Sequence, residues 1–288
     1  MVQWRRYYDT TTHGFDKITA MAVSPDGTKL AVHGSLIGGE RDSFIFVIRP
    51  SDGGHETEIA RVRHGQVDLS EHIVSDPGIV FGASGMVFLA FKQISRTLRT
   101  KGSQNNYAGR MMVGAFNPAT SQMDWVKEHS LWGYSASIVY KNYGAGQPNL
   151  FVGGSIDENP ENNNNKSWRP AIMRLKEDGT SGLNADFLIQ SELYTDESKS
   201  PYIDNMHLDD TVSGEEWLFG TTRNLDIGNT AKEILFWKCD LDPITHNPRD
   251  DNMVVTHLRD GQIENHGWII GVKPTLVNGD MHLLYNSN

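Results

Sequence analysis

The sequence predicts an all-β fold, a β-propeller with five blades of up to four antiparallel strands. A pattern of two short apolar runs joined by a turn occurs five times in the chain, at intervals of about 57 to 68 residues, and a fixed period of this size is typical of repeat architectures. Each of the first four copies is followed by a second pair of strand-like runs. No segment keeps a helical apolar period over several turns, so we expect almost no helix.

The first hairpin shows the pattern clearly. An apolar run from Ile18 to Val23 precedes the turn sequence SPDG, and a second apolar run covers Leu30 to Val32. In such turns Pro and Asp start the bend and Gly takes the positive dihedral angle. The four other hairpins are GIVFGASGMVFLAFK (78–92), ASIVYKNYGAGQPNLFVGGS (136–155), NMHLDDTVSGEEWLFGTT (205–222) and IIGVKPTLVNGDMHLLYNS (269–287).

The second strand pair of each blade follows a polar loop of variable length. The four pairs are SFIFVIRPSDGG with TEIARVRH, RMMVGAFNPATSQMDWVKE, PAIMRLKEDGTSGLNADFLIQ and EILFWKCDLDPITHNPRDDNMVVTHL. Their joining pieces are again rich in turn-forming residues. We expect one propeller domain over residues 1–288, with blades at about 18–65, 72–128, 134–190, 202–258 and 267–288 plus 1–9.

The two ends of the sequence suggest how the ring closes. The segment VQWRRYY (2–8) matches the outer strand QMDWVKEHS (122–130), and no such strand follows the last hairpin. We therefore expect residues 2–8 to pair with the blade built from residues 267–287, which would hide two sheet edges. That blade would have three strands, or the chain is a domain cut from a longer parent.

The turn SPDGTKLAV and the strand pair GAFNPATSQMDWVKE resemble repeats of known β-propellers, of the WD-like and the bacterial β-propeller-repeat type. The resemblance covers nearly the whole chain. It implies the propeller fold and no particular chemistry, because these motifs encode strand pairing and turns.

Composition excludes several classes of function. The formal net charge is −10 and no cluster of Lys and Arg stands out, so we expect no nucleic acid as a partner. No apolar stretch is long enough to span a membrane, and the first ten residues lack the apolar core of a signal peptide. We expect no membrane insertion, and an extracellular location only if the chain is an excised domain of a secreted parent. The single cysteine, Cys239, is expected to be a buried apolar residue.

Histidines occur in every predicted connection between blades, where the chain would enter the central mouth. They are His13, His72, His129, His207 and His266. Converging imidazoles can hold a metal ion. Their distances from the following strand differ, however, so we expect no metal site and no cofactor.

Carboxylates near the same mouth favour a different chemistry. The segment SDPGIVFGASGMVFLAF is similar to the Asp-Pro strand of five-bladed glycosidases, and this similarity would make Asp76 a pKa-setting or orienting acid. Asp16, Asp204 and Glu264 are the other acids near blade entrances. The Glu-Gly-Pro neighbourhood of a proton donor is missing, and Asp-Pro is also a common turn opener.

Long polar insertions at 92–109, 155–169 and 222–232 fall between the second and third strands, on the same face as the connections between blades. Aromatic residues near these loops are typical of a recognition surface; they are Tyr107, Trp132, Tyr134, Trp168 and Trp268. We therefore predict a non-enzymatic propeller that binds a protein or a carbohydrate through this face. The alternative is a glycosidase-like hydrolase with carboxylates at the axis, in which loss of Asp76 and Glu264 together would abolish turnover.

Overall fold

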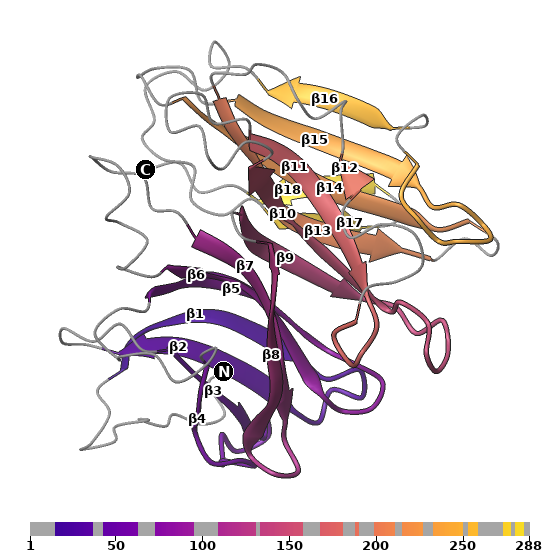
Figure 1. The fold of residues 1–288 in the computed structure, drawn as a ribbon. Helices are drawn as coiled ribbons and strands as arrows, with labels where there is room; N and C mark the ends of the chain where they lie inside the picture. The colour runs from indigo at the N-terminus through magenta and orange to yellow at the C-terminus, as the bar shows by residue number, and fades with distance from the viewer. Residues whose placement is uncertain are drawn as a thin grey trace.

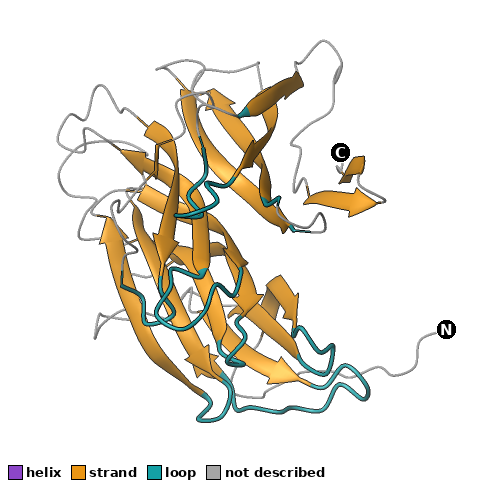
Figure 2. Cartoon of the chain, turned by 90° about the vertical axis from the view of Figure 1, so that its right-hand side faces the viewer, coloured by secondary structure: helices purple, strands orange, loops and turns teal. Residues whose placement is uncertain are grey.

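The computed structural model of the chain describes residues 15–36, 43–62, 73–94, 109–130, 133–157, 168–180, 188–189, 199–210, 215–226, 233–249, 253–258, 273–277 and 280–284. Every regular element in these ranges is a β-strand (Figures 1 and 2). They contain no helix that could cross a lipid bilayer.

The strands form four four-stranded antiparallel sheets and one two-stranded sheet. Within each four-stranded sheet the strands lie side by side in chain order, as in a propeller blade. Blade 1 consists of β1 (Phe15–Val23), β2 (Leu30–Leu36), β3 (Ser43–Ile48) and β4 (Ala60–Arg61). Blade 2 consists of β5 (Ile73–Phe81), β6 (Val87–Ile94), β7 (Gly109–Asn117) and β8 (Gln122–Ser130).

The later blades follow the same order. Blade 3 consists of β9 (Gly133–Tyr140), β10 (Leu150–Asp157), β11 (Trp168–Leu175) and β12 (Leu188–Ile189). Blade 4 consists of β13 (Lys199–Asp209), β14 (Trp217–Asp226), β15 (Glu233–Asp240) and β16 (Val254–Leu258). The described part of blade 5 is the hairpin of β17 (Lys273–Val277) and β18 (Asp280–Leu284).

The first strands of successive blades contact one another: β1 contacts β5, β5 contacts β9, β9 contacts β13, and β13 contacts β17. They are therefore the inner strands of the molecule. This arrangement confirms the predicted all-β propeller, in which the innermost strand of every blade lines the axis. It does not single out a WD-like repeat type. The outer strand predicted from residues 2–8 lies outside the described residues.

The hydrophobic core consists of layers between neighbouring blades. One cluster joins Ile45 and Val47 of blade 1 to Leu89 and Phe91 of blade 2. Corresponding clusters join blade 2 to blade 3 and blade 3 to blade 4. The largest fully buried side chain is that of Trp237, in the last of these clusters. Burial of one such large apolar side chain contributes about 1.5–3 kcal/mol, so these layers hold the blades in place.

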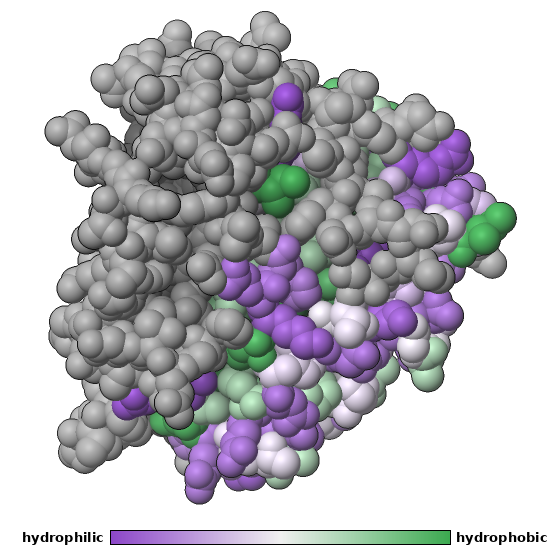
Figure 3. Space-filling view, in the orientation of Figure 1, coloured by the Kyte–Doolittle hydropathy of each residue, from purple (hydrophilic) through white to green (hydrophobic). Residues whose placement is uncertain are grey.

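Hairpin turns gather at one face of the molecule, which we call the turn face. Its described turns include 24–29, 82–86, 141–149 and 176–180. In the first of them the Asp26 carboxylate accepts hydrogen bonds from the Ser24 hydroxyl and the Thr28 amide, and Gly27 has a φ of 71°. The chain enters each blade at the opposite face, the entrance face. Figure 3 shows a mostly polar described surface on which hydrophobic side chains form small, separate groups.

Candidate active site

The inner strands of blades 2 and 4 contain irregularities of register at acidic residues. In β5 the pairing passes from Ser75 opposite Lys92 to Gly78 opposite Ala90, so Asp76 lies in the irregular stretch together with Pro77. In β13 the shift falls between Ile203 and Asn205, and Asp204 is the extra residue. An extra residue bends its strand and redirects a side chain, and such bulges are common beside active sites.

The inner strands of blades 1 and 3 have related irregularities. Strand β1 has two, at Asp16 and at Thr19, and β9 has one at Ala136. Thr19, Pro77 and Ala136 each lie four residues before the last residue of their strand. Asp204 lies five residues before the last residue of β13. The inner strands of blades 1 to 4 thus each have a bulge four or five residues before the end of the strand. Three of the four acids that the sequence placed near blade entrances, Asp16, Asp76 and Asp204, lie at register shifts, and Glu264 lies outside the described residues.

A close approach of two backbones fixes the bulge of blade 2. A methyl group added at Gly78 would lie 2.8 Å from the backbone nitrogen of Ile138 and 2.8 Å from the Cα of Ser137, both in β9. Real Cβ atoms do not come this close to backbone atoms, so only glycine fits here. The Asp76-Pro77 bulge is therefore held directly against blade 3.

Buried contacts fix the bulge of blade 4. Ile203 and Met206 flank Asp204 and are 0% and 8% exposed. Both side chains pack on Gly153 of blade 3, where a Cβ would lie 2.7 Å from Ile203 and 2.8 Å from Met206. The backbone N–H of Met206 donates a hydrogen bond to the Ser137 hydroxyl at 2.8 Å. Blade 3 thus supports the bulges on both sides of it.

The bulge of blade 1 differs chemically from those of blades 2 and 4. Its residue, Thr19, forms a hydrogen bond through its hydroxyl with Nδ1 of His33, which is 1% exposed. His33 lies in the second strand of the same blade. The bulge of blade 1 thus has a hydroxyl and an imidazole where the bulges of blades 2 and 4 have carboxyl groups.

Other residues that the sequence proposed for the axis are placed as follows. His207 is exposed and lies three residues from Asp210, near the turn end of β13 and away from the entrance face. His129 lies in the outermost strand of blade 2. His13, His72, Glu264 and His266 lie outside the described residues. Among the described residues, no group of three His, Cys, Asp or Glu could hold a metal ion.

Only backbone positions are described for two of the five aromatic residues proposed for ligand binding. Tyr134 pairs with Ser155, and Trp168 pairs with Asp157 at the start of β11. Tyr107, Trp132 and Trp268 lie outside the described residues. Ser137 and Gly78 are not among the residues predicted from the sequence. The only signal at Ser137 is a polar residue between the apolar Ala136 and Ile138.

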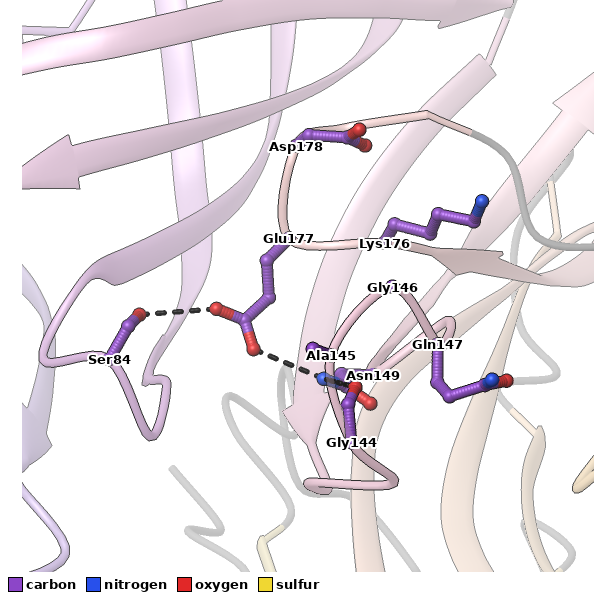
Figure 4. A pocket seen from close by; sticks show the side chains of 9 residues that line it. All are labelled: Ser84, Gly144, Ala145, Gly146, Gln147, Asn149, Lys176, Glu177 and Asp178. Carbon is purple, nitrogen blue, oxygen red and sulfur yellow. Dashed lines mark hydrogen bonds between the residues drawn. The ribbon is translucent and has the colours of Figure 1, made fainter.

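A pocket of about 430 Å³ opens on the turn face, between turns of blades 2 and 3 (Figure 4). The Glu177 carboxylate lies at its edge and accepts hydrogen bonds from the Ser84 hydroxyl at 3.1 Å, the Tyr140 hydroxyl at 2.8 Å and the Asn149 amide at 3.1 Å. Burial and the neighbouring carboxylate raise the pKa of Tyr140. Glu177 thus uses its oxygens to join the two blades, which makes this pocket a structural junction.

A second polar junction joins blades 3 and 4 on the same face. The buried Arg174 guanidinium lies over the rings of Tyr143 and Phe151 and donates hydrogen bonds to the carbonyl oxygens of Thr245 and Pro148. Burial lowers the pKa of Arg174 to about 10. Tyr143 donates to the Glu216 carboxylate at 2.9 Å, and burial together with that carboxylate raises its pKa. These groups are committed to blade packing.

No protein-family profile matches this chain, and no curated protein sequence matches it. Several solved structures resemble it. A GH43 β-xylosidase/α-arabinofuranosidase from a compost microbial metagenome is 10% identical, with a TM-score of 0.43 over 95% of this chain and 96% of that one. A Penicillium chrysogenum α-L-arabinanase is 10% identical, with a TM-score of 0.48 over 86% and 67%. A GH43_1 enzyme from Xanthomonas citri is 9% identical, with a TM-score of 0.42 over 95% and 92%.

These resemblances correct one prediction. The sequence favoured a non-enzymatic binding propeller, whereas the similar structures named above are glycoside hydrolases, the class of the alternative. The prediction failed because it gave weight to aromatic residues in loops and treated Asp76 as a turn residue. At identities and TM-scores this low, the activity of the present chain has to be argued from its own residues.

Proposed function

We propose that the chain is a glycoside hydrolase that acts at the propeller axis. The observation that supports this proposal is the position of Asp16, Asp76 and Asp204, which all lie at register shifts of inner strands. Glycoside hydrolysis needs two carboxyl groups on opposite sides of one bond. Inner strands of different blades approach the axis from different directions, so acids on them are suited to this arrangement.

The reaction is balanced by two proton transfers. One carboxylic acid donates its proton to the glycosidic oxygen as the bond from the sugar carbon to that oxygen breaks. A carboxylate takes a proton from water as the water oxygen bonds to the same sugar carbon. The products are two free hydroxyl compounds, and no cofactor or redox partner is required.

A comparison of single variants tests the proposal. Asp16→Asn, Asp76→Asn and Asp204→Asn are assayed beside the unchanged protein on a panel of aryl pentosides and hexosides. Loss of a general acid or base lowers kcat by about 10²- to 10⁴-fold, and we expect losses in this range for at least two of the three variants. Asp209→Asn is the matched control, because Asp209 is a carboxylate of the same inner strand β13 that pairs regularly with Trp217.

Two results would contradict the proposal. One is that the unchanged protein releases no aryl alcohol from any member of the panel. The other is that all three variants keep the activity of the Asp209→Asn control. Melting temperatures of all variants are measured in parallel, so that variants that lose activity because they do not fold are distinguished from folded, inactive variants.

A further inference from the structure

We propose that Ser137 is a positioning residue that couples the bulge of blade 2 to the bulge of blade 4. This inference rests on the proposed function, since Asp76 and Asp204 are two of its candidate acids. Ser137 itself lies in blade 3, in the inner strand β9, and is 4% exposed. The strand β9 contacts both β5 and β13, so it separates the two bulges and touches both strands that carry them.

On the blade 4 side the coupling is a buried hydrogen bond. The Ser137 hydroxyl accepts a hydrogen bond of 2.8 Å from the backbone N–H of Met206. The two residues are 69 positions apart in the chain. Met206 follows Asp204 by two residues. The regular pairing of β13 with β14 is interrupted at Asp204 and resumes at Asn205 and Met206. A buried N–H without an acceptor is unfavourable. The hydroxyl of Ser137 therefore fixes the position of the chain directly after Asp204.

On the blade 2 side the coupling is a backbone contact. Gly78, two residues after Asp76, lies so close to Ser137 that a Cβ would come within 2.8 Å of the Ser137 Cα and 2.9 Å of its carbonyl carbon. Any movement of the Ser137 backbone is therefore transmitted to the chain directly after Asp76. The same residue thus determines the position of both acid-bearing segments.

The bulge of blade 3 fits this supporting role. Its extra residue is Ala136, which has no functional group and directly precedes Ser137. Blades 2 and 4 have acids at the corresponding irregularities, whereas blade 3 has a small residue followed by a buried hydroxyl. Blade 3 accordingly supplies the support and its two neighbours supply the carboxyl groups.

The first test is independent of activity. Amide hydrogen exchange, followed by mass spectrometry, is compared between the unchanged protein and Ser137→Ala in peptides that cover β5 and β13. We expect faster exchange in both peptides, although they belong to different blades. Thr57→Val is the matched control, because the Thr57 hydroxyl also accepts a buried backbone N–H, that of Val47 in blade 1. Faster exchange in β13 alone, or in neither strand, would overturn the coupling.

The second test uses turnover of the aryl glycoside that the unchanged protein cleaves best. A displacement of reacting groups by about 1 Å can cost about 100-fold in rate. We expect Ser137→Ala to lower kcat at least tenfold with a smaller change in KM, and to alter the pH profile of kcat/KM. Thr57→Val should leave both unchanged at a similar loss of melting temperature. Equal effects of the two variants on kcat would overturn the positioning role.

The two tests separate the two claims. If the unchanged protein cleaves no glycoside and exchange rises in both strands of Ser137→Ala, the proposed function fails and the coupling stands. If the protein is active and exchange changes in β13 alone, the coupling fails and the proposed function stands.

Discussion

Glu177 of blade 3 accepts a hydrogen bond from the hydroxyl of Ser84 in blade 2 at 3.1 Å, across 93 residues of sequence. The same carboxylate accepts hydrogen bonds from Tyr140 and Asn149 of its own blade. One side chain thus joins turns that are remote in sequence and adds a polar contact to the hydrophobic interface between the two blades.

Replacement of Glu177 by glutamine should therefore destabilise the protein. The amide nitrogen would replace one carboxylate oxygen and could not accept a hydrogen bond there. Loss of one such half-buried hydrogen bond costs about 0.5–1.5 kcal/mol. We expect the melting temperature in differential scanning calorimetry to fall by about 2–4 °C per kcal/mol. Asp124→Asn is the control, because this exposed carboxylate accepts a hydrogen bond from Asn117 of its own hairpin. Equal melting temperatures for the two variants would contradict this prediction.

Substitution of Gly78 by alanine should destabilise the protein more than substitution of Gly27 by asparagine. Its Cβ would press on the backbone of Ser137 and Ile138, which cannot move like the end of a flexible side chain. Overpacking of this kind costs about 1–3 kcal/mol. Urea unfolding measures the difference. Gly27→Asn is the comparison, because Gly27 has a φ of 71° and open space around its Cβ position, and Asn tolerates that dihedral angle. A smaller loss for Gly78→Ala than for Gly27→Asn would refute the close approach.

Arg174→Ala should lower the free energy of unfolding by about 2–3 kcal/mol. The guanidinium is 3% exposed and donates to carbonyl oxygens of both blades that it joins. Arg174→Lys should recover only part of the loss, because a single ammonium cannot reach both carbonyls in the geometry of the planar fork. Denaturant titrations of the two variants compare them. If Arg174→Lys were as stable as the unchanged protein, the two hydrogen bonds of the guanidinium would not be needed for stability, and this prediction would be wrong.

The stability of the folded protein should decrease as the pH falls from about 4 to about 2, in part because carboxyl groups in its turns become protonated. The Ser24 hydroxyl and the Thr28 amide lower the pKa of Asp26 from 3.8 to about 2. A carboxyl group with a lowered pKa in the folded state stabilises the protein above its unfolded pKa, and this contribution is lost as the pH falls through the folded value. Asp26→Asn should therefore show a smaller loss of melting temperature between pH 4 and pH 2.5 than the unchanged protein. An equal loss of melting temperature between pH 4 and pH 2.5 in the two proteins would contradict this prediction.

Deletion of residues 1–9 should lower the melting temperature by several degrees and promote aggregation. This prediction comes from the match of residues 2–8 to outer strands. Calorimetry and size-exclusion chromatography measure the two effects. An unchanged melting temperature with a monomeric elution volume would mean that the ring does not depend on this segment.

The sequence by itself determined the repeat and most of its local structure. The turn SPDG forms as predicted because Asp26 and Gly27 satisfy the turn through contacts within a few residues. The apolar runs form strands because alternating side chains bury themselves between blades, and Cys239 is buried as expected. The Asp-Pro pair at Asp76 is visible in the chain itself, and the role of Asp76 as an orienting acid stays a prediction.

Only the tertiary structure decided which residues work together. A bulge is a property of strand pairing, so the register shifts at Asp76 and Asp204 depend on partners in β6 and β14 that no local pattern specifies. Ser137 gains its role from a partner 69 residues away, and Glu177 from one 93 residues away. Local sequence encodes dihedral preferences and burial, whereas contacts between blades arise only when the inner strands assemble around a common axis.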